Sequence, residues 1–356
     1  MNFGFNLARR GFLAAATLAV GALIAGCSGG SNSATPSVPQ TNTGSAAGGE
    51  RELARVTVNP AIHVVATDLR VHAMGAFGHF IPNQRMYAAG PSTYSCPTDS
   101  QCLQNHGGPT LKNVGSIHVF VNPSQTGSTF PNMCTVSNCP PAQWGFPGGA
   151  IGRFDGSTLS TEMHQYVGTS SATHQFPYVG YITMTDSTIT ADDTVLHAVT
   201  PAKITAELKA ASGAIGLTGY HYMYQLFYVK DQWLCNDPTH CYAPGGGSKF
   251  VFCAYHGSQT VSTNHIIFSV EPWQMVSGCE APTNTIQNDT ASTLSHEWYE
   301  AITDPDLSAW YRNSDGQEIG DICRNSYGDI ILNPDAIDYN IQQEWNNATE
   351  GCDFGP

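Results

Sequence analysis

Charged residues are scarce in this chain, and positively charged ones are the scarcest. Only 12% of the 356 residues are charged, and 14 lysines and arginines stand against 28 aspartates and glutamates, which gives a net charge of -14. A chain this acidic lacks the basic patch that nucleic-acid binding requires. It is also repelled by anionic lipid, so any attachment to a membrane needs a source other than positive charge.

Several sequence motifs that carry chemistry are missing as well. The chain has no phosphate loop, no dinucleotide-binding glycine fingerprint and no G-x-S-x-G nucleophile elbow. Its 11 cysteines include no C-x-x-C pair, which disfavours a zinc ribbon. We also find no internal repeat. These absences leave a domain whose chemistry must come from histidines and carboxylates.

The first 27 residues have the features of a bacterial lipoprotein signal peptide. Met1–Arg10 is short and basic, Gly11–Ile24 is an apolar run, and small residues lead up to Cys27. The apolar run is too short for a comfortable membrane span. We therefore expect cleavage before Cys27 and a lipid on its side chain, with an uncleaved anchor helix as the alternative. The adjacent Arg9 and Arg10 also resemble a twin-arginine export signal.

After Cys27, the composition predicts a flexible tether followed by one folded domain. Residues 28–54 are rich in small and polar residues and have no hydrophobic periodicity. Residues 55–356 are long enough for one large domain, which we expect to be extracytoplasmic and of the α+β class, with many strands. Alternating apolar residues predict extended segments or strands at 55–74, 116–122, 176–185, 220–230, 249–256 and 265–270. Thr200-Pro201 opens a predicted helix that stops at Gly213.

The even number of cysteines left after Cys27 predicts a domain stabilised by disulfides, as is common in exported proteins. Sequence alone does not fix the pairing. The spacing suggests the pairs Cys96–Cys102, Cys134–Cys139, Cys235–Cys241, Cys253–Cys279 and Cys323–Cys352.

The most informative stretch is a predicted helix that contains Ser295-His296-Glu297 and Glu300. Residues four apart on a helix share one face, so His296 and Glu300 can hold one metal ion together. Glu297 lies beside them, where a zinc hydrolase keeps its general base. This is the zincin pattern H-E-x-x-H with glutamate in place of the second histidine, and carboxylate oxygen is an ordinary zinc ligand.

The ends of this helix, and an alternative interpretation of its polar side, follow from the same stretch. Its start is expected at the N-cap candidates Asn288, Asp289 and Thr290, and its end at Pro305. The alternative is that His296 and its neighbours form the solvated face of a surface helix. Against this, the helix carries no lysine or arginine, whereas a solvated face usually mixes charges of both signs.

A catalytic zinc needs a third protein ligand, and three downstream acids are candidates. Asp321 is our first choice, because the predicted Cys323 disulfide would hold its loop. Glu318 comes second. Asp306 is third, ten residues after His296 as in metzincins, although the chain has no methionine after Met275 to form their later turn. Asp304 is expected to cap the loop after the helix, because Asp-Pro favours turns. His256 ends a predicted strand and could face the cleft, but a lone histidine is more often structural.

Two sequence blocks resemble a known family. S-H-E-x-x-E-x-x-T-D-P, at 295–305, and E-I-G-D-x-C, at 318–323, lie in a stretch from Phe252 to Cys323 that is similar to secreted bacterial and fungal proteins grouped near the plant EXORDIUM, or phosphate-induced, proteins. The resemblance implies an extracellular protein. Bacterial members of this group keep the zincin-like residues, so the resemblance supports a peptidase indirectly.

Three functions follow as hypotheses. The first is a lipid-anchored, zincin-like metallohydrolase, most simply a peptidase, in which His296, Glu300 and a downstream acid bind zinc and Glu297 activates water. Calcium is an alternative ion, because carboxylates dominate the site. The second is a non-catalytic envelope module that binds cell-wall glycan or a protein. The third is a glycosidase that uses Glu297 and Glu300.

Overall fold

The computed structural model describes residues 62–66, 102–123, 144–145, 147–155, 157–168, 176–189, 195–332 and 337–355. The chain divides into two units, Met1–Gly49 and Glu50–Pro356, and every described residue belongs to the second. The predicted signal peptide, Cys27 and the whole of the predicted tether lie outside the described residues. Within the described part of the chain, no helix is both long enough and apolar enough to span a membrane.

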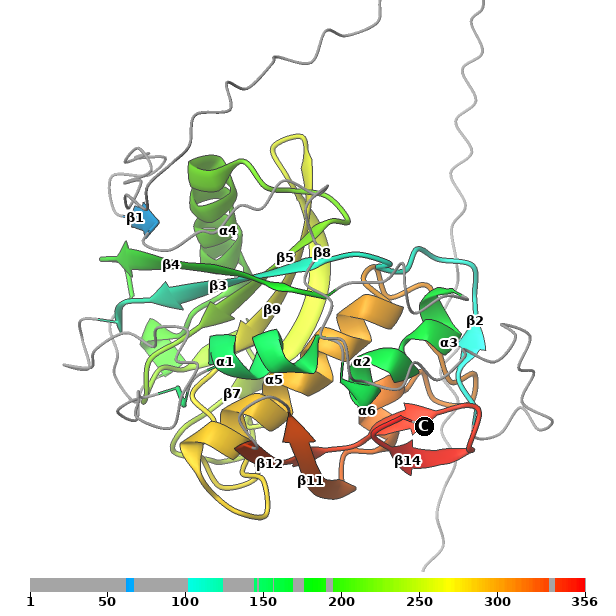
Figure 1. Ribbon diagram of the computed structural model, residues 1–356. Coiled ribbons are helices and arrows are strands. Elements are labelled where there is room, and N and C mark those ends of the chain that lie inside the picture. The colour runs from blue at the N-terminus through cyan, green and yellow to red at the C-terminus, as the bar shows by residue number, and fades with distance from the viewer. Residues whose placement is uncertain are drawn as a thin grey trace, which may run out of the picture. The chain divides into compact units, whose positions relative to one another are not determined.

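A mixed sheet of six strands forms the centre of the described unit, and helices accompany it, so the fold is α+β (Figure 1). The strands lie in the order β1-β4-β3-β5-β9-β8. The four in the middle run parallel, while β1 pairs antiparallel with β4 and β8 pairs antiparallel with β9. The strands are β1 (Ile62–Ala66), β3 (Gly115–Val121), β4 (Tyr178–Asp186), β5 (Tyr222–Phe227), β8 (Tyr255–Val261) and β9 (Asn264–Glu271).

Burial follows from the place of each strand in this sheet. Every residue of the central β3 is buried, as expected for a parallel strand covered on both faces. On one face, Ile117 and Val119 pack with Ile204 and Leu208 of α4 (Pro201–Ile215). On the other, Phe120 belongs to a second apolar cluster with residues of α1 (Pro147–Phe154) and α5 (Ile286–Thr303). The sheet is thus the middle layer, with α4 on one side and α1 and α5 on the other (Figure 1).

Shorter elements complete the described unit, and two of them, α6 and β12, contact α5. The short helices are α2 (Thr158–Glu162), α3 (His164–Val167), α6 (Ile319–Ile322) and the 3-10 helix η3 (Val195–His197). The paired strands are β2 (Gln104–Asn105) with β10 (Trp310–Tyr311), β6 (Leu234–Asp237) with β7 (His240–Tyr242), β11 (Tyr327–Leu332) with β12 (Ile337–Gln342), and β13 (Glu344–Asn346) with β14 (Gly351–Asp353).

Most of the predicted elements that fall on described residues are present, with two changes at their ends. The helix predicted to stop at Gly213 continues to Ile215, and Gly216, at φ 70°, ends it instead. Gly216 adopts a left-handed conformation that costs glycine little, which suits a residue just past a helix end. The strand predicted at 249–256 begins only at Tyr255. Its expected apolar positions Phe250 and Phe252 pack from a loop against the α4 side of the core.

Three of the predicted disulfides are confirmed, namely Cys235–Cys241, Cys253–Cys279 and Cys323–Cys352. The other two predicted pairs include cysteines outside the described residues. Disulfides of this number indicate an oxidising, extracytoplasmic environment. Cys323–Cys352 joins the end of α6 to β14, and α6 carries Asp321, so this crosslink holds a segment of the candidate site.

Candidate metal centre

Helix α5 carries the zincin-like residues, and its start differs from the prediction. The helix begins at Ile286, and the side chain of Thr285 accepts a hydrogen bond from the backbone nitrogen of Asn288 at 3.3 Å. The expected N-caps at 288–290 are therefore wrong, because the threonine three residues earlier already satisfies a free N–H group of the first turn. Asp289 lies inside the first turn and accepts from the backbone nitrogen of Ala281. The helix ends at Thr303, before Pro305, as predicted.

The polar face of α5 is not a solvated surface. Glu297 is 3% exposed, Glu300 is 4% exposed and Thr303 is fully buried. Trp298 and Ile302 on the opposite face are fully buried in the apolar core. Because α5 contacts β8, β9, β12 and α6, both of its faces are covered. The structure therefore disagrees with the interpretation of α5 as an ordinary surface helix.

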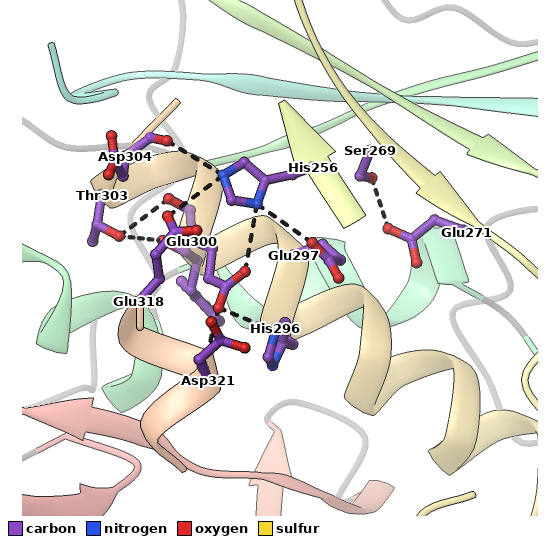
Figure 2. A network of polar contacts seen from close by, with 12 residues as sticks. His256, Ser269, Glu271, His296, Glu297, Glu300, Thr303, Asp304, Glu318 and Asp321 are labelled. Carbon is purple, nitrogen blue, oxygen red and sulfur yellow. Dashed lines mark hydrogen bonds and ion pairs between the residues drawn. The ribbon is translucent and has the colours of Figure 1, made fainter. Parts of the chain in front are cut away.

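A histidine from the sheet reaches the polar face of α5. His256 is the second residue of β8, and its Nδ1 lies 3.4 Å from Glu297 Oε2 and 3.4 Å from Glu300 Oε2. Its Nε2 lies 3.3 Å from the carbonyl oxygen of Asp304 and 3.6 Å from Glu318 Oε1. His256 thus lies between the acids of α5 and the segment that leads into α6 (Figure 2). Sequence reasoning assigned it a structural role, because a lone histidine carries no spacing signal.

The predicted ligands His296, Glu300 and Asp321 are brought together. His296 Nε2 lies 3.1 Å from Glu300 Oε1, and ligand atoms of all three residues lie within 4.8 Å of one another. The backbone nitrogen of Asp321 donates to the same Glu300 oxygen at 3.1 Å. Helix α6 thereby fixes the carboxylate of Glu300 and presents the side chain of Asp321 to His296.

The other two downstream acids have different surroundings. Glu318 is the N-cap residue of α6 and faces His256 rather than His296. Asp306 belongs to neither candidate group of ligands. It pairs instead with His265 at 3.0 Å and accepts a hydrogen bond from the Tyr220 hydroxyl. Asp304 caps the loop after α5, as predicted, since its Oδ1 accepts from the backbone nitrogens of Ser308 and Ala309.

The pKa values of the histidines and glutamates in this cluster depend on burial and on the charges next to them. Burial favours neutral imidazole, yet the adjacent carboxylates outweigh burial and raise the pKa of both His256 and His296 well above the ordinary value. Burial also opposes ionisation of Glu300, but its two histidine neighbours hold its pKa low. Burial raises the pKa of Glu297. The protons on the two imidazoles therefore balance the negative charge of Glu300. A bound metal cation would replace these protons as the compensating positive charge.

One further acid, Glu271, lies beside Glu297 and was not singled out by the sequence analysis. Glu271, at the end of β9, is 1% exposed and accepts a hydrogen bond from Ser269 at 2.6 Å. Burial, and then the charge of Glu297, raise its pKa to about 8. At neutral pH Glu271 is therefore mostly protonated and adds no further negative charge beside Glu297 (Figure 2).

The separations within the cluster fit a small cation better than direct ion pairs. Charge-assisted N–H···O bonds are usually about 2.7–2.9 Å long. Ligands that surround zinc tetrahedrally at about 2.0–2.2 Å are about 3.3–3.5 Å from each other. The two 3.4 Å distances from His256 to Glu297 and Glu300 fall in the second range, and the 3.1 Å distance from His296 to Glu300 lies midway between the two ranges. Glu297 Oε2 and Glu318 Oε1 are also buried without a hydrogen-bond partner. The residues present therefore fit a metal ion.

Gly320 and Gln342 hold the imidazole of His296 in place. The Gln342 amide nitrogen lies 2.9 Å from His296 Nδ1 and donates to the carbonyl oxygen of Gly320 at 2.7 Å. A Cβ added to Gly320 would lie 2.4 Å from His296 Nδ1. The close packing of α6 on His296 therefore requires a glycine at position 320.

Gly320→Ala is expected to weaken metal binding by about tenfold to a hundredfold, the range typical of damage to groups that orient a ligand. The added methyl group must displace His296, whereas the backbone of Gly320 has no positive φ that would strain an alanine. Competition with a chromophoric chelator measures the affinity. Gly257→Ala is the matched control, because its Cβ meets only Phe268, at 3.8 Å. Equal affinity in both variants would contradict the assignment of His296 as a ligand.

Comparison of the chain with protein-family models, with curated proteins and with solved structures gives no match. The functional argument therefore rests on the geometry of this cluster. Its two histidines and its acids come from β8, α5 and α6, which are distant in sequence and meet only in the folded domain.

Proposed function

We propose that this chain is a zinc-dependent hydrolase, most simply a peptidase, whose metal ligands are His296, Glu300 and Asp321. One observation carries the proposal. The helix pair His296 and Glu300 meets Asp321 of α6 within 4.8 Å, and histidines are the only groups that form ion pairs with the acids of this cluster in the described part of the chain. Buried carboxylates whose ion-pair partners are histidines, which can lose their protons, are groups that a cation stabilises.

In this proposal, zinc, when bound, polarises the scissile carbonyl and makes a water easier to deprotonate. Glu297 takes the proton from that water and passes it to the leaving amine. Its burial raises its pKa, which helps it to hold the proton between the two transfers. His256, 3.4 Å away, orients the Glu297 carboxylate. The side chain of His296 is 16% exposed, against 5% for the side chain of Glu297, so a substrate would approach on the His296 side.

The proposed substrate is a peptide because of the position of β8. This strand is the last in the sheet among the described residues, and it carries His256 directly over the polar face of α5. An edge strand offers unpaired backbone N–H and C=O groups, which bind an extended peptide by adding it to the sheet. We further propose that the lipid on Cys27 holds the enzyme on the outer side of a membrane, after export that uses the twin-arginine signal.

Elemental analysis of the chain from Glu50 to Pro356 tests the metal centre. We expect about one zinc per chain after purification without added metal, and loss of it in His296→Ala, because structural and catalytic zinc sites are rarely retained with one ligand removed. His240→Ala is the matched control, since His240 is exposed and pairs only with nearby residues of its own hairpin. Zinc that is absent from the parent protein, or retained in His296→Ala, would contradict the proposed ligand set.

A second candidate function is a non-catalytic envelope module that uses the ion for stability, as in the EXORDIUM-like alternative. The observation in its favour is the depth of the cluster, because the side chains of His256, Glu297 and Glu300 are only 3–5% exposed. The same protein would then bind metal and show no turnover on a peptide library. A glycosidase is not supported. Glu297 and Glu300 have oxygens within 4.8 Å with His256 between them, closer than the roughly 5–5.5 Å needed to flank a sugar bond.

A further inference from the structure

Glu300 faces two histidines with two different oxygens. Its Oε1 lies 3.1 Å from His296 Nε2, and its Oε2 lies 3.4 Å from His256 Nδ1. The two oxygens of one carboxylate therefore belong to two separate ligand groups. One group is His296, Glu300 and Asp321, and the other is His256, Glu297 and Glu300. A carboxylate placed in this way is arranged to bridge two ions, which in two-metal sites lie about 3.5–4 Å apart.

His256 has the hydrogen bonding of a metal-binding histidine. Its Nε2 lies 3.3 Å from the carbonyl oxygen of Asp304, so in a neutral imidazole the Nε2 proton would have an acceptor and the Nδ1 lone pair would face the acids. A second ring nitrogen that donates to a backbone carbonyl is the usual way to orient a ligating imidazole. The cluster around Nδ1 also contains an unsatisfied group, since Glu297 Oε2 is buried, has no hydrogen-bond partner and points at His256 (Figure 2).

The charge of the cluster is compatible with two ions. The carboxylates of Glu297, Glu300 and Asp321 supply ligand atoms to the two groups, and Glu318 lies outside both. One divalent cation between neutral imidazoles would leave one of these three carboxylates uncompensated in a site that is largely shielded from water. Buried charge without compensation is strongly unfavourable. A second divalent cation compensates the remaining carboxylate.

We infer that the centre takes a second divalent cation, held by His256, Glu297 and Oε2 of Glu300, so that Glu300 bridges it to the first. This inference rests on the metal centre proposed above and adds a means of control. Once Glu297 is a ligand, its carboxylate is no longer free to accept a proton from water. Hydrolysis is therefore expected to rise with the first equivalent of metal and to fall at least tenfold as the second site fills.

Equilibrium dialysis of the domain against increasing zinc, followed by elemental analysis, measures the stoichiometry. We expect a plateau near one zinc per chain and a second near two. Loading with Mn²⁺ and recording electron paramagnetic resonance spectra tests the bridge, because two ions that share a carboxylate interact magnetically and two separate ions do not. One ion per chain at every concentration would overturn the inference, and so would two ions without magnetic interaction.

Two variants assign the second site. His256→Ala and Glu297→Gln should each stop at one ion per chain, and Glu297→Gln keeps the shape of the side chain if removal of the histidine prevents folding. Glu350→Gln, an exposed glutamate, should still bind two. Binding of two ions by both site variants would overturn the assignment. Failure of the second site can be told apart from failure of the proposed function. Two coupled ions without peptide hydrolysis would support the second site and exclude the hydrolase.

Discussion

Glu297→Gln is expected to keep the first zinc and to lose peptide hydrolysis by a factor of about 10²–10⁴, the usual contribution of a general acid–base residue. Glutamine has the size of glutamate but does not accept the proton of the attacking water. Glu297 does not belong to the group of His296, Glu300 and Asp321 that we propose for the first ion. The loss should therefore fall on kcat, with zinc content at low metal concentration unchanged.

The measurement is a steady-state assay on a peptide substrate found by library screening, together with elemental analysis of the same samples. Glu350→Gln serves as the control, because it makes the same chemical change at an exposed position. Retained turnover in Glu297→Gln would exclude the general-base mechanism while leaving the metal site intact. Loss of turnover together with loss of zinc would instead make Glu297 a ligand of the first ion.

Added zinc is expected to stabilise the domain strongly at pH 8 and weakly at pH 5. In the metal-free protein, carboxylates raise the pKa of His256 and His296 well above the ordinary value, in spite of burial. A group whose pKa is raised by folding adds stability that is complete below its unfolded pKa of about 6.5 and is lost as the pH rises through the folded pKa. The metal-free protein therefore loses this contribution in alkaline solution.

Zinc reverses that loss, because it binds neutral imidazole and competes with the same protons. Where each ion displaces one proton, its affinity rises up to about tenfold per pH unit below the histidine pKa, and a ligand at a thousand times its dissociation constant stabilises by about 4 kcal/mol. Thermal unfolding with and without zinc, from pH 5 to pH 8, measures the effect. Glu300→Gln should abolish it at every pH. A zinc effect that is flat with pH would mean that the histidines are not the ligands.

The helix and its reactive residues were predictable from the sequence because their relationship is local. His296 and Glu300 are four residues apart, and a helix places such residues on one face in any protein. The partner Asp321 was the first of three candidates, and only the fold separates it from Asp306, which lies with Tyr220 and His265 instead.

His256 could not be predicted in the same way. Its meeting with Glu297 and Glu300 depends on β8 pairing antiparallel with β9 in a register that puts His256 opposite Ser269. No periodicity records that long-range pairing, and a shift of one residue would turn the histidine to the other face of the sheet. The one available signal is weak, namely a histidine at the end of a predicted strand that precedes the helix in sequence.

The burial of the polar face of α5 could not be predicted from the sequence either. Thr293, His296, Glu297 and Glu300 form a polar stripe whether water or protein covers them, so periodicity alone does not separate a wet face from a covered one. The absence of lysine and arginine from α5 was the informative feature. The cationic side chain of a lysine or arginine on this helix would neutralise the acids that are expected to hold the metal.

The disulfide Cys323–Cys352 also sets an order of events in the life of the chain. It ties the end of α6, which carries the proposed ligand Asp321, to β14, and Cys352 follows Cys323 by 29 residues. The fixed site thus depends on a segment that is made after all of its proposed ligands. Because the bond persists only under oxidising conditions, a newly made chain in a reducing cytoplasm lacks the crosslink that fixes its third ligand. The same disulfide that secures the fold would thereby keep the proposed hydrolase inactive in the cytoplasm of the cell that makes it.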